Sequence, residues 1–118
     1  MKFINIYSGD LKEGKTSEFV AWLEANEEAL ADAHPEGSEY MGTYFNVIGG
    51  TTSEGSVYTL IGMDSYGTRD ALAEALAEAG GEYNRLLNEF IGFLDQSNSA
   101  NVGQVLLKKA TEASTFGD

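Results

Sequence analysis

The alternation of apolar and polar residues along four segments of the chain predicts four β-strands, because a strand turns successive side chains to opposite faces. These segments are rich in β-branched and aromatic residues, and turn-forming residues bound them. They cover residues 3–8, 39–48, 56–63 and 102–108. The stretch 49–55, between the second and third segments, is polar and glycine-rich, which is typical of a hairpin connection.

Two longer regions repeat their apolar residues at the three- to four-residue spacing of an amphipathic helix. The first runs from about Thr16 to Ala33. The second begins near Thr68 and is broken at Gly80-Gly81, since each glycine costs a helix ~1 kcal/mol relative to alanine. The chain therefore predicts the element order β-α-β-β-α-β, with the second helix in two pieces.

This order is that of the split βαβ, or ferredoxin-like, arrangement, an α+β fold in which four antiparallel strands carry the helices on one face. Right-handed crossovers and short connections leave few rival topologies. We expect a single ferredoxin-like domain over residues 1–110, because a chain of 118 residues has the usual size of one domain. Residues 111–118 are expected to form a frayed C-terminal tail.

Sorting the strand residues by parity gives two faces of the expected sheet. One set is almost wholly aliphatic and is expected to pack under the helices: Ile4, Ile6, Met41, Phe45, Val47, Val57, Ile61, Met63, Val105 and Leu107. The opposite set combines tyrosines with aliphatic residues: Phe3, Asn5, Tyr7, Tyr40, Tyr44, Asn46, Ile48, Tyr58, Leu60, Val102, Gln104 and Leu106. Such a patch exceeds the few hundred Å² that a monomer normally exposes. We therefore expect a second copy of the chain to cover this face, which predicts a homodimer.

The element order, the chain length, the broken second helix and the doubly covered sheet resemble the dimeric α/β-barrel proteins of ferredoxin-like fold. The resemblance covers roughly residues 2–110 and rests on topology and pattern, without a signature motif that would assign catalytic residues. It implies that the sheets of two subunits form a barrel with the helices outside. The group includes cofactor-independent monooxygenases, muconolactone isomerases and haem-degrading enzymes, so the fold alone does not select an activity.

The composition limits the partners and the chemistry. With 7 basic against 19 acidic residues, the formal net charge is −12, and such a surface repels nucleic acids and anionic lipids. The chain has no cysteine, which excludes disulfides, thiol nucleophiles and cysteine-ligated metals. No apolar run approaches the ~20 residues of a transmembrane helix, and no apolar signal segment follows Met1, so a soluble, cytoplasmic protein is expected.

His34 is the only histidine and therefore the only imidazole available as an acid, a base or a haem ligand at neutral pH. Its place beside Pro35, at the expected end of a helix, favours a structural interpretation, because a cationic imidazole interacts favourably with the helix C-terminus. One histidine cannot form a multi-histidine site and no calcium-type loop is present, so no metal is expected. The glycine-rich stretches 49–55 and 80–81 match neither phosphate-binding fingerprint, and we expect no cofactor.

Aromatic and amide side chains are the candidates for a ligand site, because rings form the walls of such cavities and a few polar groups orient the ligand. They are Trp22, Tyr7, Tyr44, Asn46 and Tyr58, with His34 as a sixth. The alternative interpretation places Trp22 in the core and the tyrosines in the dimer interface. Arg69 and Arg85, the only arginines, can each bind a carboxylate, but among so many acidic residues a surface ion pair is expected for both.

The sequence leaves three candidate functions for the protein. A homodimer that binds a small apolar or aromatic molecule follows from the covered sheet face and from the absence of a catalytic motif. The alternative is a cofactor-independent monooxygenase or isomerase, which the resemblance and the aromatic residues support. An RNA-binding sheet, suggested by Tyr7 and Tyr58 on adjacent strands, conflicts with the acidic net charge.

Overall fold

The computed structural model describes residues 2–48, 56–95 and 103–112 of the chain. In chain order the elements are β1 (Phe3–Asp10), α1 (Thr16–Asp32), β2 (Ser38–Phe45), β3 (Ser56–Met63), α2 (Thr68–Ala77), α3 (Glu82–Gly92), β4 (Gly103–Lys108) and a short 3₁₀ helix, η2 (Ala110–Glu112). The expected element order is confirmed, and so is the α+β class. The expected hairpin connection at 49–55 lies outside the described residues.

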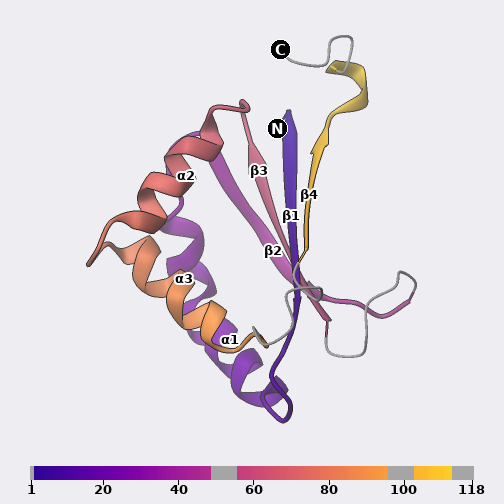
Figure 1. Cartoon of the computed structure of the whole chain (residues 1–118), viewed down its shortest axis with the longest axis vertical. Coiled ribbons are helices and arrows are strands. Elements are labelled where there is room, and N and C mark those ends of the chain that lie inside the picture. The colour runs from indigo at the N-terminus through magenta and orange to yellow at the C-terminus, as the bar shows by residue number, and fades with distance from the viewer. Residues whose placement is uncertain (1, 49–55, 96–102, 113–118) are drawn as a thin grey trace.

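The strands form one antiparallel sheet in the order β2-β3-β1-β4, the order of a ferredoxin-like fold. All three α-helices lie on one side of this sheet (Figure 1). The domain limit at residue 110 stays a prediction. Of the expected tail, Thr111 and Glu112 belong to η2, and residues 113–118 lie outside the described part.

The break in the second helical region is confirmed. Gly80 lies between α2 and α3 with a φ of +81°, in the left-handed region that glycine adopts without steric cost. The chain changes direction there, so α2 and α3 can each cover a different part of the sheet (Figure 1). No helix in the described ranges combines the length and the apolar character needed to cross a membrane.

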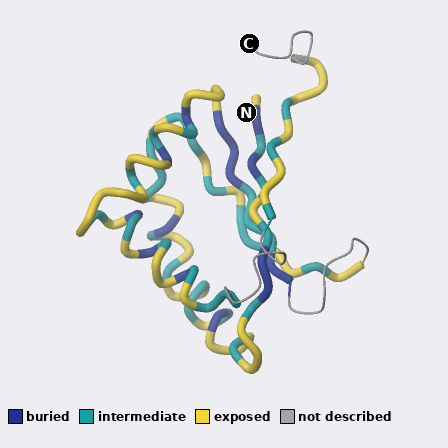
Figure 2. Tube along the Cα trace, in the orientation of Figure 1, coloured by how far each residue is buried: buried dark blue, intermediate teal, exposed yellow. Residues whose placement is uncertain are grey.

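The core lies between the helices and the two central strands, β1 and β3, where the buried residues gather (Figure 2). It consists of two clusters. One cluster joins Phe3, Ile61, Met63, Leu72 and Tyr83, and the other joins Phe19, Leu30, Val57, Leu86 and Phe90. Each cluster contains residues of β3 and of α3, so α3 packs against the sheet in both parts of the core.

The expected facing of β1 is wrong. Phe3 pairs with Met63 and shares a buried cluster with Leu72 of α2, so Phe3 and every second residue after it face the helices. Asn5 and Tyr7 therefore lie on the helix side, and the isoleucines between them lie on the opposite side. The expected facing of β4 is wrong in the same way, because Gln104 and Leu106 face the helices, whereas Val105 and Leu107 face away.

β2 ends at Phe45, three residues earlier than expected, and Val47 and Ile48 are exposed beyond its end. A register shift between Tyr40 and Thr43 places both of these residues on the helix side, contrary to the expectation for Tyr40. The facing expected for β3 and for Tyr44 is confirmed, since Tyr44 pairs with Tyr58 on the side away from the helices.

The side of the sheet away from the helices, called the outer face below, is strongly apolar. Its large side chains are Ile4, Ile6, Tyr44, Tyr58, Leu60, Val105 and Leu107. Val105 and Leu107 keep 52% and 47% of their surface exposed, and no helix of the described residues lies over them (Figure 1). The expectation of a large apolar outer face therefore holds, although most of its members are aliphatic.

Candidate functional site

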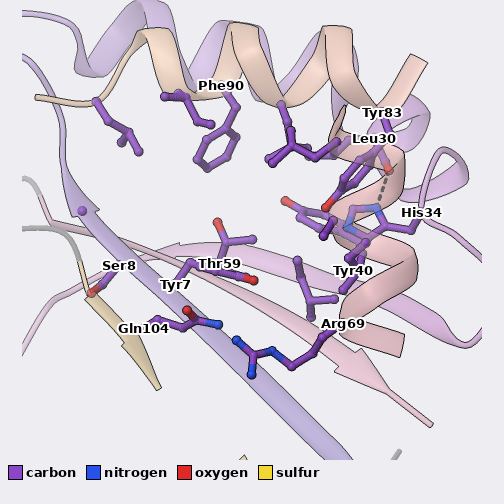
Figure 3. A pocket seen from close by; sticks show the side chains of 18 of the residues that line it. Tyr7, Ser8, Leu30, His34, Tyr40, Thr59, Arg69, Tyr83, Phe90 and Gln104 are labelled. Carbon is purple, nitrogen blue, oxygen red and sulfur yellow. Dashed lines mark hydrogen bonds between the residues drawn. The ribbon is translucent and has the colours of Figure 1, made fainter. Parts of the chain in front are cut away.

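A cavity of about 690 Å³ lies between the sheet and the helical layer (Figure 3). Its floor is the helix side of β1, β3 and β4, and its walls come from α2, α3 and the end of α1. Most of the lining is apolar: Leu30, Val57, Ile61, Leu72, Leu87 and Phe90 all contribute. The polar members of the lining are fewer and come from separate elements, so they can orient a bound molecule without making the cavity hydrophilic.

A hydrogen-bonded chain of side chains runs along the floor of the cavity. The Gln104 amide nitrogen, Nε2, donates to Asn5 Oδ1 at 3.0 Å, and Asn5 Nδ2 donates to the phenol oxygen of Tyr7 at 2.7 Å. Asn5 is completely buried, whereas Tyr7 keeps 40% of its surface exposed because it borders the cavity. Since the Tyr7 oxygen accepts from Asn5, its own hydrogen can be donated to a molecule in the cavity.

His34 lies at one end of the cavity, just after α1 (Figure 3). Its Nδ1 lies 2.7 Å from the backbone oxygen of Leu30, and because a carbonyl only accepts, Nδ1 carries a hydrogen. Burial lowers the pKa of His34, against the smaller opposing effect of this hydrogen bond. The ring is therefore neutral at pH 7, and its Nε2 is a bare acceptor.

The neighbours of His34 close off its Nε2, which is buried without a hydrogen-bond partner. The ring of Tyr83 stands edge-on to the imidazole at a centroid distance of 4.8 Å, and the ring of Tyr40 lies 5.7 Å away. The bond to Leu30 agrees with the structural interpretation of a histidine at a helix end, but the ring acts there in its neutral form.

Two tyrosines of the cavity wall are held in the protonated form. Burial, and secondarily the nearby Tyr7, raise the pKa of Tyr83 to about 12. Burial also raises the pKa of Tyr40, although its hydrogen bond with Thr43 acts in the other direction. Both phenols therefore keep their hydrogens at neutral pH; that of Tyr40 bonds to Glu27 at 2.7 Å.

Of the candidate residues from the sequence, the structure brings Tyr7 and His34 together in the cavity lining. Tyr44 and Tyr58 lie on the outer face and do not line the cavity. Because Tyr7 and Tyr58 lie on opposite faces, they do not form the stacking platform that suggested an RNA-binding sheet.

Trp22 and Asn46 also lie away from the cavity. Trp22 packs against Phe90 and Phe93, and its indole nitrogen donates to Glu89 at 2.8 Å. Asn46 follows the end of β2, where its backbone nitrogen donates to the Ser56 carbonyl. The structure therefore agrees with the packing interpretation of Trp22.

The sequence analysis missed Thr59, Tyr83 and Gln104 as cavity residues, and for Arg69 it expected a surface ion pair and no place in the cavity. Tyr83 stands among apolar residues at helical spacing in the second helical region, which is the pattern of an ordinary core residue. Gln104 was assigned to the wrong face of β4. An amide residue inside an apolar strand is the signal that could have found Gln104, since the buried Asn5 needs a partner such as the Gln104 amide. Within the described part of the chain, no three histidine or acidic side chains are grouped as a metal site requires.

No protein-family model matches the chain, and no curated protein sequence matches it. Several solved structures are similar in fold. An uncharacterized NIPSNAP domain protein from Burkholderia xenovorans superposes with a TM-score of 0.68 at 18% identity, over 93% of this chain and 96% of that one. A NIPSNAP family protein with unknown function from Agrobacterium tumefaciens gives 0.67 at 17% identity, over 92% and 88%.

A dimeric ferredoxin-like protein of unknown function from Jannaschia sp. CCS1 is also similar, with a TM-score of 0.63 at 14% identity, over 92% of this chain and all of that one (100%). At such low identity these likenesses establish the fold and no activity. The ferredoxin-like fold expected from the sequence is confirmed.

Proposed function

We propose that two copies of the chain associate through their outer faces, and that each copy binds a small apolar or aromatic molecule in its cavity. The observation that carries the binding proposal is the cavity itself. Its volume of about 690 Å³ lies within the ~300–1,000 Å³ of small-molecule sites. Its lining combines aliphatic and aromatic walls with a few polar groups, the usual composition of such sites.

The outer face supports the proposed homodimer. Aliphatic and tyrosine side chains from all four strands form it, and Val105, Leu107 and Tyr44 are about half exposed. A continuous apolar surface across a whole sheet is larger than monomers normally leave in water. The described dimeric state of the Jannaschia protein, whose fold is similar, also supports a second copy as the partner.

The buried position of His34 Nε2 supports binding in preference to the alternative of a monooxygenase or isomerase. A general base must reach the proton that it removes, at a heavy-atom distance of about 2.6–3.2 Å. In this cavity the single imidazole turns its acceptor nitrogen into protein, where no solvent reaches it. Tyr83 and Tyr40, the phenols beside it, keep their hydrogens at neutral pH, so neither acts as a base.

Light scattering tests the dimer. We expect a mass of about twice the 12.7 kDa of one chain, and we expect Leu107→Lys on the outer face to give the monomer, because an unpaired ammonium is costly in an apolar interface. Ala77→Lys, at an exposed position of α2, is the control and leaves the dimer intact. A monomeric wild-type protein at micromolar concentration would contradict this part of the proposal.

Calorimetric titration with a neutral aromatic probe, 2-naphthamide, tests the cavity. Ala73→Trp places an indole where Ala73 lines the cavity, and we expect it to weaken binding about tenfold or more, since the indole occupies the ligand's space. Ala77→Trp carries the same ring on the same helix at a position outside the lining and leaves binding unchanged. Equal binding by both variants would show that the probe does not enter this cavity.

A further inference from the structure

The two arginines of the chain have different electrostatic surroundings. Arg85, on α3, donates to Glu82 at 2.6 Å and to Glu89 at 2.8 Å, so its charge is balanced on both sides. Arg69, on α2, has no carboxylate within ion-pair distance among the described residues. The surface ion pair expected from the sequence is therefore confirmed for Arg85 and wrong for Arg69.

Arg69 instead interacts with an aromatic side chain. Its Nη1 donates to the phenol oxygen of Tyr66 at 3.0 Å, and its guanidinium carbon lies 5.4 Å from the centre of that ring. These contacts hold the guanidinium in place without neutralising its charge, and they leave other donors of the fork unused. The Arg69 fork can therefore still accept an anionic partner.

Arg69 also lines the cavity, and among the described residues that form the lining it is the only lysine or arginine. Its side chain extends from α2 toward the sheet, and its guanidinium points toward Gln104 below Tyr7 (Figure 3). Tyr7 can donate its phenol hydrogen into the same space, because its oxygen already accepts from Asn5. Donors from α2, β1 and β4 thus border one side of a mostly apolar cavity.

Resting on the proposed function, we infer that the cavity takes an apolar molecule that carries a carboxylate, and that Arg69 binds this carboxylate. A planar guanidinium matches a carboxylate with two parallel hydrogen bonds, and such charge-assisted bonds are about twice as strong as neutral ones. Asp70 also borders the cavity but is exposed and makes no ion pair with Arg69, so it does not take the place of the ligand. The aliphatic and aromatic walls accept the apolar body.

The net charge of −12 means that an anionic ligand needs a local positive charge in order to bind. Long-range repulsion from the acidic surface disfavours anions everywhere outside a local positive site. An anion that nevertheless binds in this cavity needs a cation at contact distance, and in the described lining only Arg69 provides one. Selectivity for a carboxylate over a neutral group of the same shape is therefore a direct readout of this side chain.

The experiment compares 2-naphthoate with 2-naphthamide, two probes of nearly the same shape that differ in charge, by calorimetric titration at neutral pH. We expect the wild-type protein to bind the carboxylate about tenfold more tightly. Arg69→Gln should bring the two affinities to within about twofold, and Arg69→Lys, which keeps the charge without the fork, should retain part of the preference.

Arg85→Gln is the matched control, because it removes the same charge from the chain at a position outside the cavity. It should keep the preference for 2-naphthoate. A wild-type protein that binds both probes equally, or an Arg85→Gln variant that loses the preference as fully as Arg69→Gln, would overturn the inference while leaving the proposed binding function in place. Failure of both probes to bind would contradict the proposed function itself.

Discussion

Asn5 and Tyr7, two residues apart on β1, are joined by a hydrogen bond of 2.7 Å from the Asn5 amide nitrogen to the Tyr7 phenol oxygen. Residues at this spacing face the same side of a strand, so the bond fixes both side chains on the helix side of the sheet. Asn5 is fully buried and Tyr7 borders the cavity. The pair therefore connects the protein core with the candidate ligand site.

Asn5→Ala should destabilise the protein by about 2 kcal/mol, because it removes two side-chain hydrogen bonds and leaves a void in the packed layer. Gln104→Ala removes one of these bonds at an exposed position and should cost well under half as much. Urea unfolding at one fixed protein concentration measures both, since a dimer's stability depends on concentration. Equal losses for the two variants would contradict the central role of Asn5.

The same pair shows where prediction from the sequence fails. The strands, the helices and the break at Gly80 were predictable, because periodicity and turn residues depend on local geometry. The facing of β1 was not, since both parity sets of this strand are largely apolar: Phe3 and Tyr7 on one side, Ile4 and Ile6 on the other. Hydrophobicity identifies the buried face of a strand only when the other face is polar.

The candidate site was predictable to a smaller degree for a related physical reason. A cavity under the helices accepts aromatic and amide groups, so its floor is more polar than an ordinary core. The sequence analysis therefore assigned Tyr7 and Gln104 to the outer face and the aliphatic residues of β1 to the inner one. Of the six candidates from the sequence, Tyr7 and His34 line the cavity, and their role in binding stays a prediction.

Gly80→Ala should lower the melting temperature by about 4–5 °C. The position has a φ of +81°, where an alanine costs about 1 kcal/mol even though no atom lies within 4 Å of the added methyl group. Gly92→Ala, at the end of α3 with equally open space and no positive φ, is the matched control. It should leave the melting temperature unchanged or raise it, because alanine favours a helix over glycine.

Trp22→Phe should leave the binding of 2-naphthamide unchanged, because the indole lies outside the cavity lining. The variant loses the hydrogen bond to Glu89 at the surface but keeps aromatic contacts with Phe90 and Phe93, so we expect a stability loss of about 1 kcal/mol or less. Phe90→Ala, which changes the cavity wall, should weaken binding in the same titration. A large binding defect in Trp22→Phe would extend the site beyond the cavity described above.

The contribution of His34 to the free energy of unfolding should fall as the pH decreases from 7 to 5. Burial holds the pKa of His34 in the folded protein below its ordinary value of 6.5. As the pH falls below 6.5, the unfolded chain therefore binds a proton at this imidazole before the folded protein does. Stability rises with pH wherever the unfolded state binds more protons, so this contribution is complete above pH 6.5 and is lost below it. Tyr40 and Tyr83, the phenols beside the imidazole, stay protonated throughout this range.

His34→Asn separates this effect from the titration of the acidic residues. An asparagine amide can donate to the Leu30 carbonyl as Nδ1 does, but it carries no titratable nitrogen in place of the buried Nε2. Urea unfolding between pH 5 and 7 should therefore give a flatter stability profile for the variant than for the wild-type protein. The same slope in both proteins would mean that His34 is not held neutral by its surroundings, and a wild-type profile that rises toward pH 5 relative to that of the variant would reverse the assigned direction of its pKa.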